Sequence, residues 1–182
     1  MRADALKNRE ALIAVAREHL RAQGVSTSLD AIAREAGVGA GTLYRHFPDR
    51  DHLLSAALNA EGEELRAVAD RIRANSVGGE RIEEWLVEVE RYLRTFRGLP
   101  EPLAQALEKG SDTPLAIRCE EIVAITDEFL AEAVRDGTAR EGVTGQDLFE
   151  AALMVVWLSS QVAEDRRGLG GVRNLLRRGY RR

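Results

Sequence analysis

Cysteine, proline and long apolar segments are all scarce in this chain of 182 residues. Its single cysteine, Cys119, excludes an internal disulfide framework and argues against cysteine-based zinc or iron–sulfur sites. The longest apolar run, 151–158, has eight residues, whereas about 18 are needed to span a bilayer. The first ten residues, MRADALKNRE, contain no apolar segment of the kind that secretory signals require. We therefore expect a cytoplasmic protein without membrane contact.

Sequence signatures of catalysis and of metal binding are also missing. The chain has no G-x-S-x-G and no phosphate-binding loop. A metal site would need His19 or His52 to have a His or Glu partner at helical spacing together with a third ligand, and the sequence offers no such set. We therefore interpret both histidines as solvated helix residues. Cys119 has no histidine in its own helical segment. We predict no catalytic residues, no metal and no cofactor, which leaves an all-helical enzyme as the least supported function.

What the chain does contain is the composition of a folded helical protein. Acidic residues number 30 and basic residues 26, for a net charge of -4, and 45% of the residues are hydrophobic. Alternation of the strand type is absent, while Ala, Leu, Glu and Arg dominate. The four prolines lie near expected helix boundaries. We predict an all-α fold with helices over residues 3–23, 29–36, 40–47, 49–74, 80–96, 103–109, 115–135, 145–164 and 172–178.

Apolar residues recur at helical spacing in the longer segments. The first helix carries Leu6, Ile13, Ala16 and Leu20, and Gly24 follows it as a C-terminal stop. The segment 49–74 reads as one long helix, with its stripe formed by Leu54, Leu58, Leu65, Val68 and Ile72.

Residues 28–47 carry the most information about function. Two short helices meet at a turn that contains Gly37, a residue suited to a left-handed backbone. This is the arrangement of a helix-turn-helix, whose second helix enters the major groove of DNA. Ile32, Ala33, Val38, Leu43 and Phe47 are expected to hold the two helices together. Thr42, Tyr44, Arg45 and His46 then present polar groups outward, where they suit phosphates and base edges.

The run TSLDAIAREAGVGAGTLYRHFPDRDHLLSAAL, residues 27–58, resembles the N-terminal domain of TetR-family transcriptional regulators. The blocks AIAREAGV, GTLYRHF and P-x-R-x-x-L-L follow in the family's order and spacing. The resemblance covers about Leu6–Leu58, and the rest of the chain matches only in architecture. It implies a DNA-binding domain over 1–50, joined by a long fourth helix to a helical effector-binding and dimerisation domain over 51–182.

The resemblance also implies DNA contacts residue by residue. It places Thr42, Tyr44, His46, Arg50 and Ser28 at positions that often contact the phosphate backbone. Two positions depart from the family, because Gly39 stands where Ser is frequent and Ala40 stands where a polar residue is frequent. Base reading therefore depends more on Arg45 and Tyr44. The predicted DNA-binding residues are Ser28, Gly39, Ala40, Gly41, Thr42, Tyr44, Arg45, His46 and Arg50.

If the family architecture holds, the helices after residue 80 enclose an effector pocket. Its candidate residues are Trp85, Tyr92, Phe96, Arg118, Phe129 and Trp157, although the aromatic ones also suit a plain core. Arg118 shares a face with Leu115, Ile122 and Phe129, and a charge on an apolar stripe must be paired or functional. Glu121 is its candidate partner. If Arg118 meets the effector instead, an anionic or carbonyl-bearing molecule is expected.

Helix 145–164 has two apolar faces, one with Leu148, Val155, Ser159 and Val162 and the other with Met154, Trp157 and Gln161. Two buried faces suit a homodimer built from residues 145–180, whose apolar contact face is expected to include Leu148 and Val155. The seven arginines of 166–182 are interpreted as a solvated or acid-paired face. The leading hypothesis is a dimeric repressor that binds double-stranded operator DNA and is released by a small hydrophobic or aromatic effector. A DNA-binding regulator without such an effector, and an activator, remain as alternatives.

Overall fold

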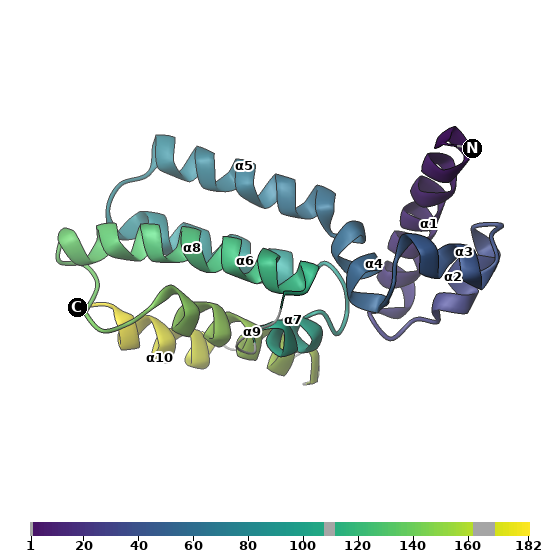
Figure 1. Cartoon of the computed structure of the whole chain (residues 1–182). Coiled ribbons are helices and arrows are strands. Elements are labelled where there is room, and N and C mark those ends of the chain that lie inside the picture. Colours follow the sequence, from purple (N-terminus) through teal and green to yellow (C-terminus); the bar gives the residue numbers. More distant parts are fainter. Residues whose placement is uncertain (1, 108–111, 162–169) are drawn as a thin grey trace.

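The computed structural model describes residues 2–107, 112–161 and 170–182, and these fold almost entirely into helices (Figure 1). Pairing of the β type within them is limited to one isolated bridge between Ala139 and Arg181. The helices are α1 Arg2–Gln23, α2 Leu29–Glu35, α3 Ala40–His46, α4 Arg50–Ala57, α5 Asn59–Asn75, α6 Gly79–Leu93, α7 Pro100–Ala106, α8 Pro114–Arg135, α9 Gly145–Gln161 and α10 Gly170–Tyr180. The predicted all-α fold is confirmed.

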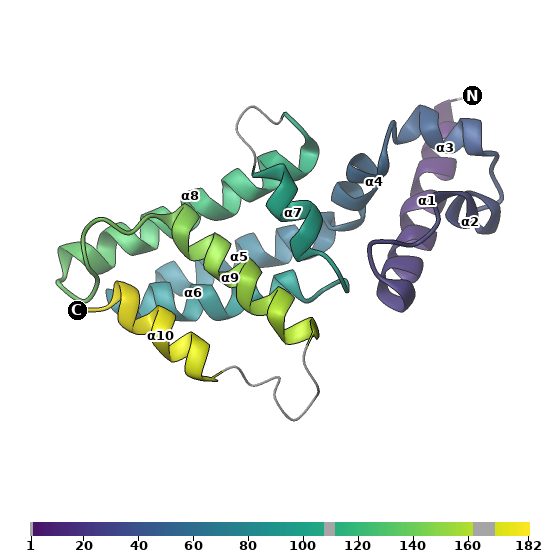
Figure 2. The same ribbon diagram turned by 90° about the horizontal axis from the view of Figure 1, so that it is seen from below.

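The helices form a small head and a larger bundle. Helices α1, α2 and α3 make the head at one end of the molecule, and α4 connects it to the bundle (Figure 1). In the bundle α5, α6 and α8 run along its length, with α6 packed against both α5 and α8. Helices α7, α9 and α10 form a further layer, seen from below in Figure 2. Helix α4 packs against α1 of the head and against α8 of the bundle, so it links the two parts.

One continuous apolar core joins the two parts. In the head the predicted helix-turn-helix contacts are confirmed, because Ile32, Ala33, Leu43 and Phe47 are buried and Val38 packs against them. The core continues through Leu54 and Leu58 into the bundle. The stripe predicted for α1 was wrong at one position, since Leu6 is exposed and Leu12 is buried instead. Leu6 lies beyond the reach of α2, α3 and α4, which cover only the later turns of α1.

The long helix predicted over 49–74 is interrupted at Leu58, which separates α4 from α5. All five residues of its predicted stripe are buried, so the periodicity was right and the continuity was wrong. The cause is a side chain from another helix. Arg118 of α8 donates from Nη2 to the Asn59 Oδ1, at 2.8 Å, and to the Ser55 carbonyl, at 3.4 Å. Insertion of a polar side chain beside the backbone hydrogen bonds is a recognised cause of helix bending.

Several other helix boundaries differ from the prediction, most of them by one or two residues. Helix α6 ends at Leu93, although Phe96 beyond it is buried in the core. Helix α7 begins at Pro100 and not at 103, because proline is well accommodated in the first turn of a helix. The predicted ends at 109 and 164 lie outside the described residues. Helix α10 extends to Tyr180, where the Arg140 amide donates to the Tyr180 carbonyl at 2.8 Å.

Candidate nucleic-acid interface

The turn between α2 and α3 is built as the sequence predicts. Ser28 caps α2, its Oγ accepting from the Ala31 amide at 3.3 Å. Gly37 has φ +72°, a left-handed conformation that side chains rarely adopt. Gly39 caps α3 without a side-chain bond. Buried Leu43 and Phe47 then fix the rotation of α3, and Arg9 of α1 lies over the Phe47 ring at 5.3 Å.

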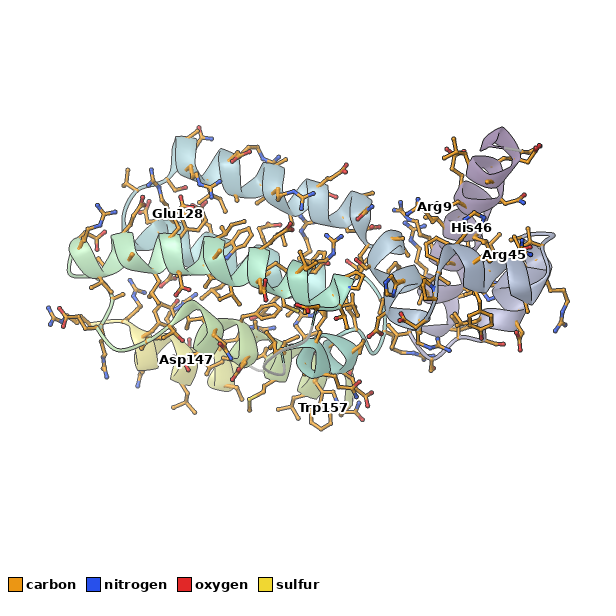
Figure 3. The ribbon with its side chains drawn as sticks, in the orientation of Figure 1. Arg9, Arg45, His46, Glu128, Asp147 and Trp157 are labelled. Atoms are coloured by element: carbon orange, nitrogen blue, oxygen red, sulfur yellow. The ribbon has the colours of Figure 1, made fainter. Side chains whose placement is uncertain are left out.

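Helix α3 presents its polar side chains to solvent, as required of a recognition helix. Tyr44 is 48% exposed, and Arg45 is also exposed. The Arg45 Nε donates to the Gly41 carbonyl at 3.0 Å, which lays the guanidinium along the helix surface. Thr42 and His46 are half-buried beside them. Figure 3 shows Arg45 and His46 at the end of the molecule far from the bundle.

The remaining DNA-contact candidates have different surroundings. Ser28, Gly39, Ala40 and Gly41 are exposed around the turn and the start of α3. Arg50 is half-buried, and its Nη1 donates to the carbonyls of Val25 and Thr27 at 2.7 and 2.6 Å. Arg50 thus holds the segment before α2 against α4. Contact of any of these residues with phosphate stays a prediction.

The predicted effector residues fall into two groups. Trp85, Tyr92, Phe96 and Phe129 are buried, and Trp85 of α6 meets Phe129 of α8 edge to face with ring centroids 5.9 Å apart. The Trp85 Nε1 donates to the Thr126 Oγ1 at 2.8 Å. Trp157 is the exception, because it is 52% exposed on the outer side of α9 and points away from the bundle (Figure 3). Its placement in the pocket was wrong, since Val155 and Val156 face the core.

Arg118 is buried among polar groups that sequence reasoning did not identify. Its expected partner, Glu121, instead pairs with Arg66 at 2.9 Å, so that prediction was wrong. Arg118 Nε and Nη1 are buried without a hydrogen-bond partner, and so are the Tyr92 hydroxyl and the Glu61 Oε2. Room for the guanidinium comes from Gly62, where a methyl group would collide with Nη1. The sequence sign of this close approach is Gly62 itself, a glycine inside an otherwise regular helical pattern.

The space beside these polar groups is small. A cavity of about 10 Å³ lies among Gly62, Tyr92 and Arg118, which is at most enough for one water molecule. Burial raises the pKa of the Tyr92 hydroxyl above its usual value, and the Arg118 charge opposes that shift. Tyr92 therefore stays protonated and able to donate a hydrogen bond.

The outer face of α9 carries apolar side chains that the described residues leave exposed. Met154 and Trp157 are 70% and 52% exposed, and Leu175 of α10 is 71% exposed. Leu148 and Val155, which were predicted for the dimer contact, are buried within the chain itself, so that assignment was wrong. The two apolar faces of α9 differ in burial, and Val162 lies outside the described residues.

Other chemistry is sparse in the part of the chain that the structure describes. No helix there is long and apolar enough to cross a membrane, and no three metal-binding side chains are grouped. Burial raises the pKa of the Cys119 thiol to about 12. A buried thiol of this kind is a poor nucleophile at neutral pH.

These features define a helix-turn-helix DNA-binding protein with a helical C-terminal bundle. Comparison with known families agrees with that class. Residues 12–57 match the family model described as bacterial regulatory proteins, tetR family, and residues 78–181 match the model of the SbtR-like transcriptional regulator C-terminal domain. The chain belongs to the TetR family of bacterial transcriptional regulators, and not to an enzyme family.

Individual relatives support the same assignment. The repressor KstR of Mycolicibacterium smegmatis is 31% identical over 143 residues, which are 76% of this chain and 66% of KstR. This chain thus spans just under two thirds of that relative. The TetR regulator SCO0520 of Streptomyces coelicolor has a TM-score of 0.60 at 28% identity, over 95% of this chain and 98% of that one. The Mycobacterium tuberculosis regulator KstR2 reaches the same TM-score at 16% identity, which concerns the fold alone.

Proposed function

We propose that the protein is a transcriptional repressor that binds a palindromic operator as a homodimer and releases it when a small molecule binds the bundle. The observation that carries DNA binding is the exposed polar face of α3. Tyr44 and Arg45 project from a helix whose rotation is fixed by buried Leu43 and Phe47. In a helix-turn-helix this face enters the major groove. The DNA-binding domain is 1–50, and α4 connects it to the effector and dimerisation domain over 51–182.

The dimer is supported by the outer face of α9 and α10. Met154, Trp157 and Leu175 are large apolar side chains exposed on neighbouring helices, and soluble monomers rarely leave such patches uncovered. A two-fold axis there would pair identical faces, as symmetric dimers do. Two α3 helices would then meet a palindromic site together.

The effector site is supported by the unpartnered polar atoms around Arg118. Leaving a buried donor unpaired costs about 1–3 kcal/mol, so a ligand oxygen that accepts from Arg118 and Tyr92 gains that energy. Leu65, Trp85, Ile122 and Ile125 also line this cavity and favour a hydrophobic or aromatic body. Because the cavity holds about 10 Å³, the effector must separate α5 from α6 and α8. It would then compete with Ser55 and Asn59 for Arg118, at the break between α4 and α5.

DNA binding is tested by selecting sites from a randomised duplex pool and measuring gel shifts of the selected site. Arg45→Ala should relax preference at particular base pairs, at a cost of about 1–3 kcal/mol. Tyr44→Ala should weaken binding to all DNA sequences by a similar factor, because it removes a contact with the phosphate backbone. Arg71→Ala on α5 removes the same charge from an exposed position. It should change neither the base preference nor the overall affinity for DNA. Folded Tyr44 and Arg45 variants with unaltered binding would refute the role of α3.

A regulator that answers only to its own concentration is the second candidate. It is favoured by the tight packing of Trp85, Phe96 and Phe129, which leaves no ligand-sized cavity among them. Loss of the gel shift on addition of small molecules supports the first candidate, and a shift that no compound disturbs supports the second.

A further inference from the structure

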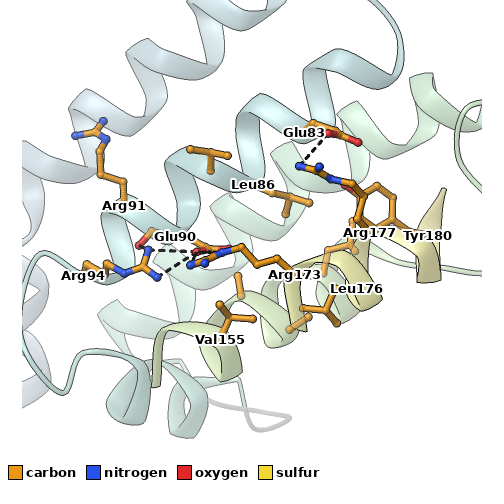
Figure 4. Close-up of a pocket in the computed structure, with 14 residues that line it drawn as sticks. Glu83, Leu86, Glu90, Arg91, Arg94, Val155, Arg173, Leu176, Arg177 and Tyr180 are labelled. Carbon is orange, nitrogen blue, oxygen red and sulfur yellow. Dashed lines mark hydrogen bonds and ion pairs between the residues drawn. The ribbon is translucent and has the colours of Figure 1, made fainter. Parts of the chain in front are cut away.

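A groove on the side of the bundle, away from the predicted effector residues, has the dimensions of a ligand site. It lies between α6, α9 and α10 and has a volume of about 390 Å³ (Figure 4), within the usual range for small-molecule sites. Its apolar lining consists mainly of Leu86, Leu148, Ala151, Ala152, Val155 and Leu176. Residues of α6, α9 and α10 together supply this lining.

Arginines outnumber glutamates among the groove's lining residues, which include Arg91, Arg94, Arg173 and Arg177 against Glu83 and Glu90. Arg91 is neutralised from outside the lining by Glu88 at 2.6 Å, whereas Glu90 is shared by Arg94 and Arg173. At one end Glu83 is shared by two guanidinium groups, at 3.2 Å from Arg177 and 3.0 Å from Arg181. One carboxylate neutralises only one of the two cations, so this end carries an excess positive charge beside an apolar surface.

The Glu83 end of the groove is held in place by the backbone. The Arg140 amide donates to the Tyr180 carbonyl, and the Arg182 amide donates to the Thr138 carbonyl at 3.1 Å. Tyr180 is buried at the same end. The backbone that carries Arg177 at the end of α10 is therefore fixed. This reduces the conformational entropy that the protein loses when an anion binds.

The groove stays open in the proposed dimer. Val155 lines the groove, whereas Trp157, two residues later, lies about 200° around the helix on the exposed face. On α10 Leu176 lines the groove and Leu175 points away from it. A partner seated on Met154, Trp157 and Leu175 would cover the opposite side of both helices.

We propose that this groove binds an elongated apolar molecule with one anionic head group, such as a medium-chain carboxylate. The head group accepts hydrogen bonds from Arg177, which lines the groove beside Glu83, a geometry that the guanidinium fork suits. The chain lies along Leu86, Ala152, Val155 and Leu176. This site is separate from the cavity at Arg118, and its occupancy does not depend on operator binding.

The test is titration calorimetry of the full chain, free of DNA, with decanoate below its micellar concentration. Decanoate should bind about tenfold more tightly than decanol or decyltrimethylammonium, because only the carboxylate meets the arginines. Arg177→Gln should weaken decanoate binding about tenfold. Arg178→Gln is the matched control, since it removes the same charge from an exposed neighbour outside the groove, and it should leave affinity within about twofold.

Two further variants locate the bound molecule. Ala151→Trp, at a half-buried position of the groove wall, should abolish decanoate binding while the thermal unfolding profile stays cooperative. Arg118→Met should bind decanoate normally. Equal affinity for decanoate and decanol, normal binding by Arg177→Gln or by a folded Ala151→Trp variant, or loss of binding in Arg118→Met would each overturn the proposal. A chain that binds decanoate but no DNA would refute only the proposed regulator.

Discussion

At the scale of single residues, Arg118 is the most informative side chain of the bundle. It is 8% exposed and yet bonds through one nitrogen, Nη2, leaving Nε and Nη1 without partners. A merely structural arginine would be expected to satisfy more of its five donors. The Tyr92 hydroxyl, which is also buried without a hydrogen-bond partner, supports the proposal that a ligand oxygen binds at this position.

Arg118→Met should raise the effector concentration needed for release while leaving operator affinity nearly normal. Methionine keeps the packing of the stem and removes the donors. The measurement is loss of the operator gel shift against a panel of aromatic carboxylates and ketones, with exposed Arg71→Met as the control. If the Arg118 variant instead unfolds, or no longer binds operator, Arg118 serves only to hold the break between α4 and α5.

At the scale of elements, α9 shows how one helix serves two surfaces. Its inner face, with Leu148 and Val155, completes the core of the protomer. Its outer face, with Met154 and Trp157, has no cover within the described residues. The unusually apolar composition of this helix is explained by one face buried at folding and another available for association.

Trp157→Arg should convert the dimer into monomers that bind a half-site weakly and a full operator no better. A charge in the centre of an apolar interface is costly because it loses its hydration. Sedimentation velocity at micromolar concentration is the measurement. Ala67→Arg, at an exposed position of α5, should remain dimeric. A native chain that sediments as a monomer would contradict the proposed interface.

At the scale of the whole molecule, the head and the bundle are joined by more than the α4 core. Glu61 of α5 pairs through Oε1 with Arg17 of α1 at 2.6 Å and with Arg21 at 3.5 Å. Its other oxygen is buried and unpartnered, and Gly62 next to it packs on Arg118. The residues that tie down α1 are therefore adjacent to the proposed effector site.

Glu61→Gln should lower the free energy of unfolding by about 1–2 kcal/mol, between the values for exposed and buried ion pairs. The neutral amide keeps the shape of the side chain and removes the counter-charge of Arg17, whereas Arg21 keeps its pair with Glu18 at 2.9 Å. Urea denaturation at low and at high salt measures the loss, which should shrink as salt screens the pair. Glu63→Gln, exposed on the same helix, should have little effect. Equal stabilities for the two variants would show that α1 is held by apolar packing alone.

Much of this molecule could be predicted from local sequence. The helix-turn-helix was predictable because Gly37, the cap at Ser28 and the buried positions Leu43 and Phe47 are all set by neighbours within a few residues. The DNA-facing side of α3 follows from the same short-range pattern. Arg118 was also identifiable, because a charge on an apolar stripe is visible in the sequence alone.

What the tertiary structure decided depends on contacts between distant segments. The break at Leu58, the pairing of Glu121 with Arg66 and the exposure of Trp157 each result from which helix lies next to which. Periodicity reports that a helix has an apolar face but not what covers it. The sequence by itself determined most of the helices, the helix-turn-helix and the family. Only packing determined where the bundle is full, at Trp85 and Phe129, and where it leaves a polar cavity and an open groove.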